Sequence, residues 1–581
     1  MGGLLAWQPD LVSGVAHAAA VVLLVCAAAL PVFVPPSVGR WARWVPSVGV
    51  VGLVGMSIAH RPSEPDHGLV VLVLGSALLV RLWAPSREGG SPSVLLTALA
   101  AALAVAVPGA LPVPPVWPEL LLLMLAVVGL AVRGRLGELQ GLDHLADYLL
   151  GSAARALVVV FAVLCAAGTL LLLLPHATTR PGAIDVVDAA FTAVSAVCVT
   201  GLIVLDTPVD FTPFGQGLLL LLIQVGGLGI MAFASLAVLT MGRRLGVREE
   251  RLTAELIGGD EVRRNFDTAL GVVLRVTLVA EGLGAAALTT LFWLDGDGLG
   301  TALWRGVFTS VSAFCNAGFA LQSDSLVPYA HHPLVLVVVS ALIVVGGSGP
   351  VVVSALVMRR RATLHRQLVV WTTALLVVVP AALFLVFEWG GVLAGMSLVD
   401  KSTNALFQSV TLRTAGFNSI DFGALRPETW TVAIVCMFVG ASPGSTGGGI
   451  KTTTAAVLAL SVVATIRGHD HTGAFGRRIA TRTVQEASAI TALGTTSVIL
   501  ALVALQLTQS LPLDQALFEV VSALGTAGIS MGATGALDDV GKLVIIACMF
   551  AGRVGPLTFF IFLVGRARDV AQVPEAPVQV G

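Results

Sequence analysis

Long apolar segments, each near the length of one membrane crossing, follow one another along the whole chain. A helix needs about 20 mostly apolar residues to cross a bilayer. Within the bilayer, backbone polar groups must be satisfied inside helices or closed barrels. The pattern therefore predicts an all-α polytopic membrane protein.

The first 135 residues form a block of their own in this pattern. We expect five extra transmembrane helices in residues 1–135, near 11–34, 44–60, 68–84, 92–112 and 117–133. The next stretch, LGELQGLDHLADYLLG, is amphipathic and predicts an interfacial helix over residues 136–151.

From about residue 152 the order of segments repeats four times: an apolar helix, a short loop, then a second apolar helix. Leading helices are expected near 153–174, 268–293, 367–389 and 484–509, and trailing helices near 214–240, 333–358, 430–462 and 542–565. The predicted repeats are 152–240, 268–358, 367–462 and 484–568, and a cytoplasmic tail over 569–581 follows. This gives about thirteen membrane spans, with four helix–pore loop–helix repeats in a pseudo-fourfold arrangement.

One phrase occurs in the loop of every repeat. The copies are FTAVSAVCVTGL (Phe191–Leu202), FTSVSAFCNAGF (Phe308–Phe319), FQSVTLRTAGF (Phe407–Phe417) and FEVVSALGTAGI (Phe518–Ile529). Carbonyls of such a loop can replace the hydration shell of an ion, and glycine permits the conformations that this needs. Small residues also serve close helix packing, but four copies at the same place in four units favour a ring around a pore.

The candidate ion-binding filter consists of the last four residues of each copy up to its glycine. We expect K⁺ to bind at Cys198, Val199, Thr200, Gly201, Cys315, Asn316, Ala317, Gly318, Arg413, Thr414, Ala415, Gly416, Gly525, Thr526, Ala527 and Gly528. Arg413 is expected to support the filter from behind, because a cation in the conduction path would repel the ion.

Each trailing helix carries a glycine-rich stretch near its middle, which predicts an interruption there: residues 225–229, 345–350, 440–454 and 551–556. The third, GASPGSTGGGIKTTT, is long enough to break its helix, and its polar residues predict a gate in the vestibule below the filter. A phosphate-binding loop is excluded, because Ile450 separates the last glycine from Lys451. The gate residues are expected to be Gly444, Ser445, Thr446, Gly447, Gly448, Gly449, Lys451 and Arg553.

Arg553 lies deep in the fourth trailing helix, and an intramembrane arginine usually faces the bundle interior. We expect it to form an electrostatic barrier below the filter and to bond carbonyls of the broken loop around Gly447–Gly449. A purely structural arginine that pins two helices is the alternative. Lys451 could do similar work or extend to the cytoplasmic interface.

Composition and charge narrow the function classes. The chain of 581 residues is 56% apolar and only 12% charged, against roughly 25% charged in soluble proteins. Its net charge of −1 indicates no nucleic acid partner. The six cysteines lack C-x-x-C spacing, so we expect neither zinc nor disulfides, and no covalent cofactor.

Arginines concentrate between the repeats, within 243–264, 359–366 and 467–482, and again at Arg566 and Arg568. The positive-inside rule places these junctions and the C-terminus in the cytoplasm, and the first five segments fit this if the N-terminus lies outside. The filter loops then enter the plasma (inner) membrane from outside.

The four tracts, the broken third helix and the late arginine resemble the Trk/Ktr/HKT superfamily of potassium transporters. FTSVSAFCNAGF, FQSVTLRTAGFNS and GSTGGGIKTTT are most similar to the KtrB/TrkH membrane subunits. The resemblance covers about 150–568 and implies one filter glycine per repeat, a homodimer, and a cytosolic ring of nucleotide-binding subunits like KtrA or TrkA. In this family a glycine at the first filter position, here Gly201, goes with potassium, whereas serine goes with sodium in some plant members. Two departures are the shorter third tract and the five extra leading segments.

The sequence thus predicts gated, channel-like potassium uptake, without covalent chemistry. Proton- or sodium-coupled symport and a sodium-permeable transporter remain alternatives, although the filter tracts hold no acidic residue. A membrane enzyme would need clustered chemical groups, whereas the histidines are scattered. A sensor or scaffold without a pore would give no ion flux in reconstituted vesicles.

Overall fold

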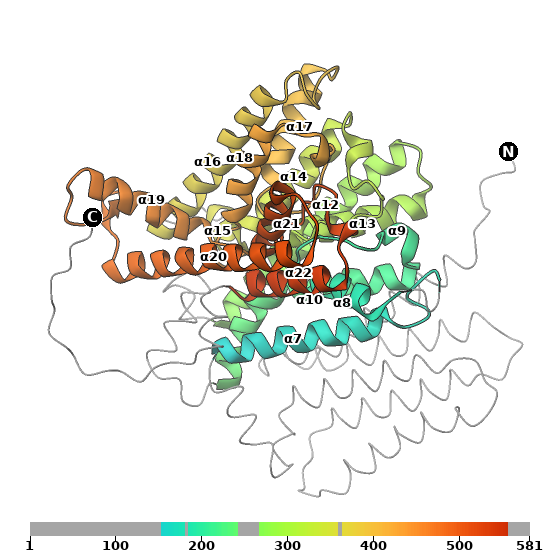
Figure 1. Ribbon diagram of the computed structural model, residues 1–581, viewed down its shortest axis with the longest axis horizontal. Coiled ribbons are helices and arrows are strands. Elements are labelled where there is room, and N and C mark those ends of the chain that lie inside the picture. The colour runs from blue at the N-terminus through green and yellow to red at the C-terminus, as the bar shows by residue number, and fades with distance from the viewer. Residues whose placement is uncertain (1–152, 181–183, 242–265, 358–362, 556–581) are drawn as a thin grey trace, which may run out of the picture.

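The computed structural model describes residues 153–180, 184–241, 266–357 and 363–555 (Figure 1). The predicted helices of 1–135, the interfacial helix of 136–151 and the tail of 569–581 lie outside the described residues. So do the arginine-rich junction at 243–264 and the last part of the fourth repeat, 556–568.

The described chain contains four units, each with a long leading helix, a short helix and a trailing helix. The first unit consists of α7 (Ala153–Leu172), α8 (Val186–Val197), α9 (Thr207–Asp210) and α10 (Pro213–Met241). The second unit consists of α12 (Phe266–Leu294), α13 (Leu299–Cys315), η5 (Val327–Tyr329), α14 (Pro333–Ser348) and α15 (Pro350–Val357).

The third and fourth units follow the same order. The third holds α16 (Leu364–Phe387), α17 (Leu398–Thr411), η6 (Phe422–Ala424), α18 (Pro427–Phe438) and α19 (Thr452–Ile466). A small antiparallel hairpin, β1 (Gly473–Ala474) with β2 (Arg477–Arg478), pairs Gly473 with Arg478 and leads to the fourth unit. That unit holds α20 (Thr481–Thr508), α21 (Leu513–Gly525), η7 (Thr534–Ala536) and α22 (Asp539–Val554).

The long leading helices suit a lipid environment. Among the described residues, three helices are long and apolar enough to cross a membrane: Gly271–Leu294, Leu364–Phe387 and Thr481–Thr508. Their outer faces leave large apolar side chains uncovered, such as Leu283 and Leu507, which are 69% and 82% exposed. Water would oppose such exposure, whereas lipid tails accept it.

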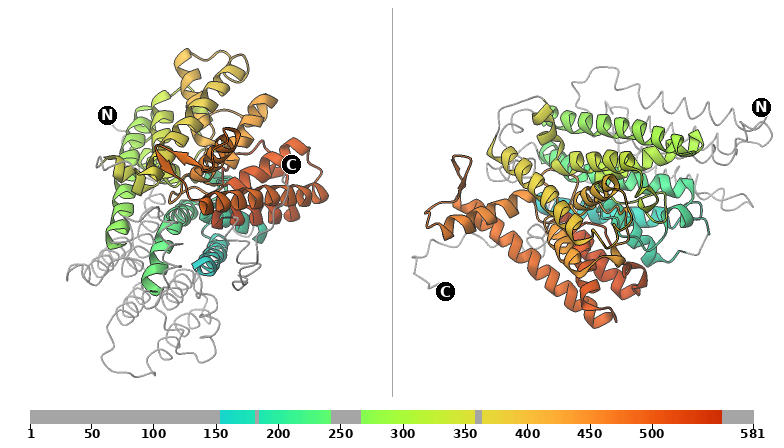
Figure 2. Two further views of the ribbon diagram at one scale, coloured as in Figure 1. Left: turned by 90° about the vertical axis from the view of Figure 1, so that its left-hand side faces the viewer. Right: turned by 90° about the horizontal axis from the view of Figure 1, so that it is seen from above.

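Contacts between neighbouring units follow one rule. The trailing helix of each unit packs against the short helix of the next, as α10 does with α13, α14 with α17, and α18 with α21. The last unit returns to the first, because α22 packs against α8 (Figure 1). In the left view of Figure 2 the cyan, green, yellow and red units accordingly lie around one centre.

The short helices are anchored by the phenylalanine that opens each repeated phrase. Phe191, Phe308, Phe407 and Phe518 are all 0% exposed, and each belongs to a buried apolar cluster. Burying one such side chain stabilises the fold by about 1.5–3 kcal/mol. These side chains fix the middle of each short helix, several residues before the end from which the repeated tract continues.

The predicted interruption at 551–556 extends beyond the described residues, and of the other three one is absent. The prediction for residues 225–229 is wrong, because α10 continues through them without a break. Its glycines serve close packing: a Cβ on Gly227 would lie 2.6 Å from Cys315 Sγ. A break does separate α14 from α15, at Gly349 with φ 86°, and a longer one separates α18 from α19.

Candidate functional site

The four tracts share one backbone conformation. The residue two positions before each glycine is left-handed, with φ 55° at Val199, 60° at Asn316, 68° at Thr414 and 50° at Thr526. Left-handed residues other than glycine are uncommon. The four glycines also have positive φ, which are 93° (Gly201), 71° (Gly318), 80° (Gly416) and 76° (Gly528). Four copies of the phrase thus fold into four copies of one turn.

A hydroxyl group ties three of the tracts to the helix before them. Ser195 Oγ donates to the Leu202 carbonyl at 2.7 Å, and Ser312 Oγ donates to the Phe319 carbonyl at 2.7 Å. Thr411 Oγ1 makes the equivalent bond to Phe417 at 2.6 Å. In the fourth tract Ser522 Oγ has no partner among the described residues. The fourth tract therefore lacks one of the bonds that fix the other three.

The third phrase is one residue shorter than the others between its phenylalanine and its glycine, but its tract keeps the same turn. In the second tract the Ala317 N–H donates to the Ser312 carbonyl, five residues back, at 2.7 Å. In the third the Ala415 N–H donates to the Thr411 carbonyl, only four residues back, at 3.0 Å. The missing residue is thus absorbed in the helix end, before the glycine.

The four glycines lie against one another. A Cβ on Gly318 would lie 2.8 Å from Gly416 Cα, and one on Gly201 would lie 3.1 Å from Gly318 Cα. A Cβ on Gly528 would lie 3.0 Å from Gly201 Cα. Residues from four distant parts of the sequence thus meet at one constriction that is lined by backbone, and no side chain fits there unless the backbone moves.

Arg413 points away from this constriction. Its side chain is 2% exposed, and its guanidinium donates to Thr373 Oγ1 of α16 at 3.4 Å. It therefore lies behind the third tract, between that tract and the leading helix.

The broken loop between α18 and α19 lies against the tracts and α14. Thr446 Oγ1 donates to the Phe314 carbonyl at the end of α13 at 3.2 Å, and the Gly448 N–H donates to Thr526 Oγ1 at 3.0 Å. The Ser442 N–H donates to the Gly347 carbonyl of α14 at 3.0 Å. The loop thus contacts residues of the second and fourth phrases directly.

Two cations hold this loop. Arg553 is 2% exposed and donates to the carbonyls of Thr446 in the loop and Gly226 in α10. Lys451 Nζ donates to the Gly447 carbonyl at 2.6 Å and to the Gly448 carbonyl at 3.4 Å. Arg553 thus bonds a carbonyl of the broken loop next to Gly447–Gly449, as expected, while Lys451 binds the carbonyls of Gly447 and Gly448 themselves.

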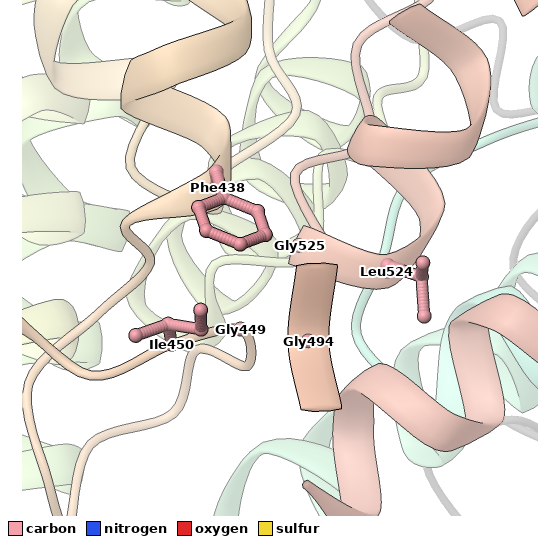
Figure 3. Close-up of a pocket in the computed structure, with 6 residues that line it drawn as sticks. All are labelled: Phe438, Gly449, Ile450, Gly494, Leu524 and Gly525. Atoms are coloured by element: carbon pink, nitrogen blue, oxygen red, sulfur yellow. The ribbon is translucent and has the colours of Figure 1, made fainter. Parts of the chain in front are cut away.

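A small apolar cavity lies beside the loop (Figure 3). Its volume is about 20 Å³, and it is lined by Phe438, Gly449, Ile450, Gly494, Leu524 and Gly525. It therefore lies where the end of the loop, α20 and the start of the fourth tract meet.

Comparison with known proteins identifies the family. The model of the TrkH family, described as cation transport protein, matches residues 156–368 and 356–567, which together cover more than half of the chain. The chain belongs to the TrkH family. The resemblance inferred from the four tracts is thereby confirmed.

Curated relatives of this TrkH-family chain match over nearly their whole length. Ktr system potassium uptake protein B of Bacillus subtilis is 36% identical over 449 residues, which cover 76% of this chain and 99% of that protein. The potassium/sodium uptake protein NtpJ of Enterococcus hirae is 34% identical, with coverages of 74% and 97%. The potassium transporter TrkH of Vibrio parahaemolyticus superposes with a TM-score of 0.62 at 20% identity, covering 85% of this chain and 98% of that one, which shows a common fold.

Two buried carboxylates lie near the tracts of this TrkH-family chain, Glu281 and Glu519; the sequence indicates pairing with other helices for Glu281 and gives no role to Glu519. Glu519 follows the phenylalanine of the fourth phrase, is 0% exposed, and accepts bonds from Thr534 Oγ1 at 2.6 Å and from the Met531 N–H at 3.3 Å. It holds the chain that leaves the fourth tract. Glu281 lies in the middle of α12 and is 7% exposed. A single acidic residue within an apolar run is the signal that could have indicated Glu519.

The site contains no side-chain metal centre in the part of the chain that the structure describes. No group of three or more His, Cys, Asp or Glu side chains is placed there to hold an ion.

Proposed function

We propose that this chain takes up potassium across the plasma membrane through a gated, channel-like pore whose selectivity filter consists of the four tracts. The observation that carries the proposal is the meeting of Gly201, Gly318, Gly416 and Gly528 at one constriction. The names of the relatives, which are potassium uptake proteins, support K⁺ as the ion.

In this proposal the four units are repeats in a pseudo-fourfold arrangement about the pore. The contacts that run from each unit to the next, and from α22 back to α8, support such an arrangement. Carbonyls of the tracts would replace the hydration shell of the ion. The glycines keep side chains out of the path, and the shared left-handed residue before each glycine gives all four tracts one shape.

The broken loop is proposed as the gate. Its residues Gly444–Gly449, together with Lys451 and Arg553, would close the path on the cytoplasmic side of the filter. The bond from Gly448 to Thr526 supports this, because it joins the loop to the filter itself. Movement of the loop would have to break that bond together with the bond that Arg553 makes to Thr446.

The proposed assembly is a homodimer on a cytosolic ring of nucleotide-binding regulatory subunits. Repeat junctions and the C-terminus would lie in the cytoplasm and the N-terminus outside, as the arginine distribution supports.

Sodium permeation through the same pore is a second candidate. It is favoured by the relative from Enterococcus hirae, whose name gives potassium and sodium together.

Uptake by reconstituted vesicles tests the proposal. Vesicles with the purified chain should take up labelled potassium well above protein-free vesicles, and unlabelled potassium should compete better than sodium. Equal competition by the two ions would favour the second candidate, and uptake no faster than in protein-free vesicles would contradict both.

A further inference from the structure

In three of the four units, a side chain of the unit's own leading helix contacts the first residue of the tract from behind. Cys165 of α7 lies against Cys198, and Thr373 of α16 bonds Arg413. In the fourth unit Gly494 of α20 and Gly525 share the small cavity, so no side chain fills the corresponding place. In the second unit, the side chain behind the first residue of the tract is a carboxylate.

That carboxylate belongs to Glu281 of α12, which forms a cluster with Gln224 and Cys315. Gln224 Nε2 of α10 donates to Glu281 Oε2 at 3.2 Å. Cys315 Sγ lies 3.5 Å from Gln224 Oε1 and 3.9 Å from Glu281 Oε1, both within reach of a thiol donor. Each carboxylate oxygen thus has a different donor within reach, Gln224 Nε2 for Oε2 and the Cys315 thiol for Oε1, although the single thiol proton can instead be donated to Gln224 Oε1.

This cluster joins three elements at the point where the second tract begins. Cys315 ends α13, and the next residue, Asn316, turns left-handed at φ 60°. The backbone of Glu281 is fixed as well, because Ser310 Oγ donates to its carbonyl at 2.7 Å. The direction of the tract therefore depends on how firmly the Cys315 side chain is held.

A buried acidic residue inside a membrane is costly and is retained for a role. The proposed pore does not use Glu281 as an ion ligand, since its side chain lies behind the tract with Gln224. We propose that Glu281 is a positioning residue for potassium selectivity, which acts through Gln224 and Cys315 to fix the second filter tract. This inference rests on the proposed function of the tracts.

Glu281→Gln tests the role with little change of shape. Glutamine has one side-chain oxygen in place of two, so residue 281 can then accept from Gln224 or from Cys315 but not from both, and its NH₂ group faces the other. Loss of one such bond should lower the ratio of potassium to sodium uptake by about threefold to tenfold. Glu281→Ala, which removes both bonds, should lower that ratio further.

Thr277→Val is the matched control. Thr277 lies one turn earlier on the same helix, is 1% exposed, and its hydroxyl has no partner among the described residues. The ratio should stay at the parent value, because valine keeps the shape and no bond is lost. A fall in this variant equal to that in Glu281→Gln would overturn the positioning role, since any change in α12 would then have the same effect.

A double variant separates positioning from a general loss of stability. Uptake ratios are measured in vesicles matched for folded protein. If Glu281 acts through Cys315, then Glu281→Gln should lower the ratio no further in a Cys315→Ala background. Additive effects would overturn the inference. Should Glu281→Gln not fold, Gln224→Ala removes the bond from Gln224 to Glu281 in the same cluster and must give the same pattern.

The uptake ratio also distinguishes failure of the proposed filter from failure of the positioning role of Glu281. A parent protein without preference for potassium overturns the proposed filter. A selective parent whose preference is lost in Gly318→Ser but kept in Glu281→Gln overturns the positioning role alone.

Discussion

Among single residues, two cations donate hydrogen bonds to backbone carbonyls of the broken loop and of α10. Arg553 joins the loop to α10, and Lys451 binds two further loop carbonyls. Both cations therefore stabilise one particular position of the loop. The same positive charge lies beside the path that we propose for the ion.

Removing the charge of Arg553 should speed cation flux. A buried cation raises the barrier for a second cation because the Coulomb energy is weakly screened there. We expect Arg553→Gln to raise potassium flux per folded molecule by on the order of tenfold, and Arg553→Lys to keep flux nearer the parent value. Vesicle flux at matched protein amounts measures this.

Arg467→Gln is the control for that experiment, because Arg467 is exposed at the end of α19. It should leave flux unchanged. Equal or lower flux in Arg553→Gln, combined with reduced yield, would assign Arg553 a structural role only.

At the scale of elements, the hydropathy pattern predicts the helices well. The leading helix expected near 367–389 spans Leu364–Phe387, and the one expected near 484–509 spans Thr481–Thr508. The residues that meet across the molecule could not be predicted in this way. Glu281 and Cys315 are 34 positions apart, and Arg553 and Thr446 are 107 apart. Helical periodicity indicates a buried face but not its partner.

The glycines of the trailing helices illustrate the same limit. Glycine both breaks helices and allows close packing. Gly227 lies inside a continuous helix against Cys315, whereas Gly349 has φ 86° and separates two helices. Pro350 directly follows Gly349 and disfavours a helical conformation there, whereas no proline lies near Gly227, so the glycine content alone does not decide between the two outcomes.

Shortening the broken loop should open the path. Deletion of three residues from Gly444–Gly449 removes part of the segment that bonds Arg553 and Thr526. We expect flux per folded molecule to rise severalfold, about threefold or more, since a plug limits conduction only while it is in place. A well-folded deletion that conducts no faster than the parent would exclude the loop as the gate.

Filling the small cavity should have the opposite effect. A Cβ on Gly494 would lie 3.1 Å from Ile450 Cδ1, so Gly494→Ala presses on the end of the loop. Overpacking at such a site limits the positions that neighbouring groups can adopt. We expect potassium flux to fall about twofold to fivefold. Gly282→Ala is the control, because no atom lies within 4 Å of a Cβ there. Equal flux in the two variants would show that the cavity plays no part in gating.

At the scale of the whole molecule, four units of one chain meet at a constriction that none of them could form alone. The contacts from α10 to α13, α14 to α17, α18 to α21 and α22 to α8 bring the four glycines together. The units are not equivalent, because the third phrase is one residue shorter than the others. The fourth tract lacks the hydroxyl bond that fixes the other three, and no side chain of its leading helix fills the space behind its first residue. We therefore expect the fourth tract to be the one that yields most readily when the gate loop moves.

The ratio of potassium to sodium uptake in Gly318→Ser tests the central claim most directly. Gly300→Ser, on the same unit but with open space around its Cβ, is the control. A side chain at Gly318 meets the backbone of Gly416 and must displace the ring. The account predicts that the ratio falls by about tenfold in Gly318→Ser and in Gly201→Ser and is unchanged in Gly300→Ser. A folded Gly318→Ser protein with the parent ratio would contradict the filter.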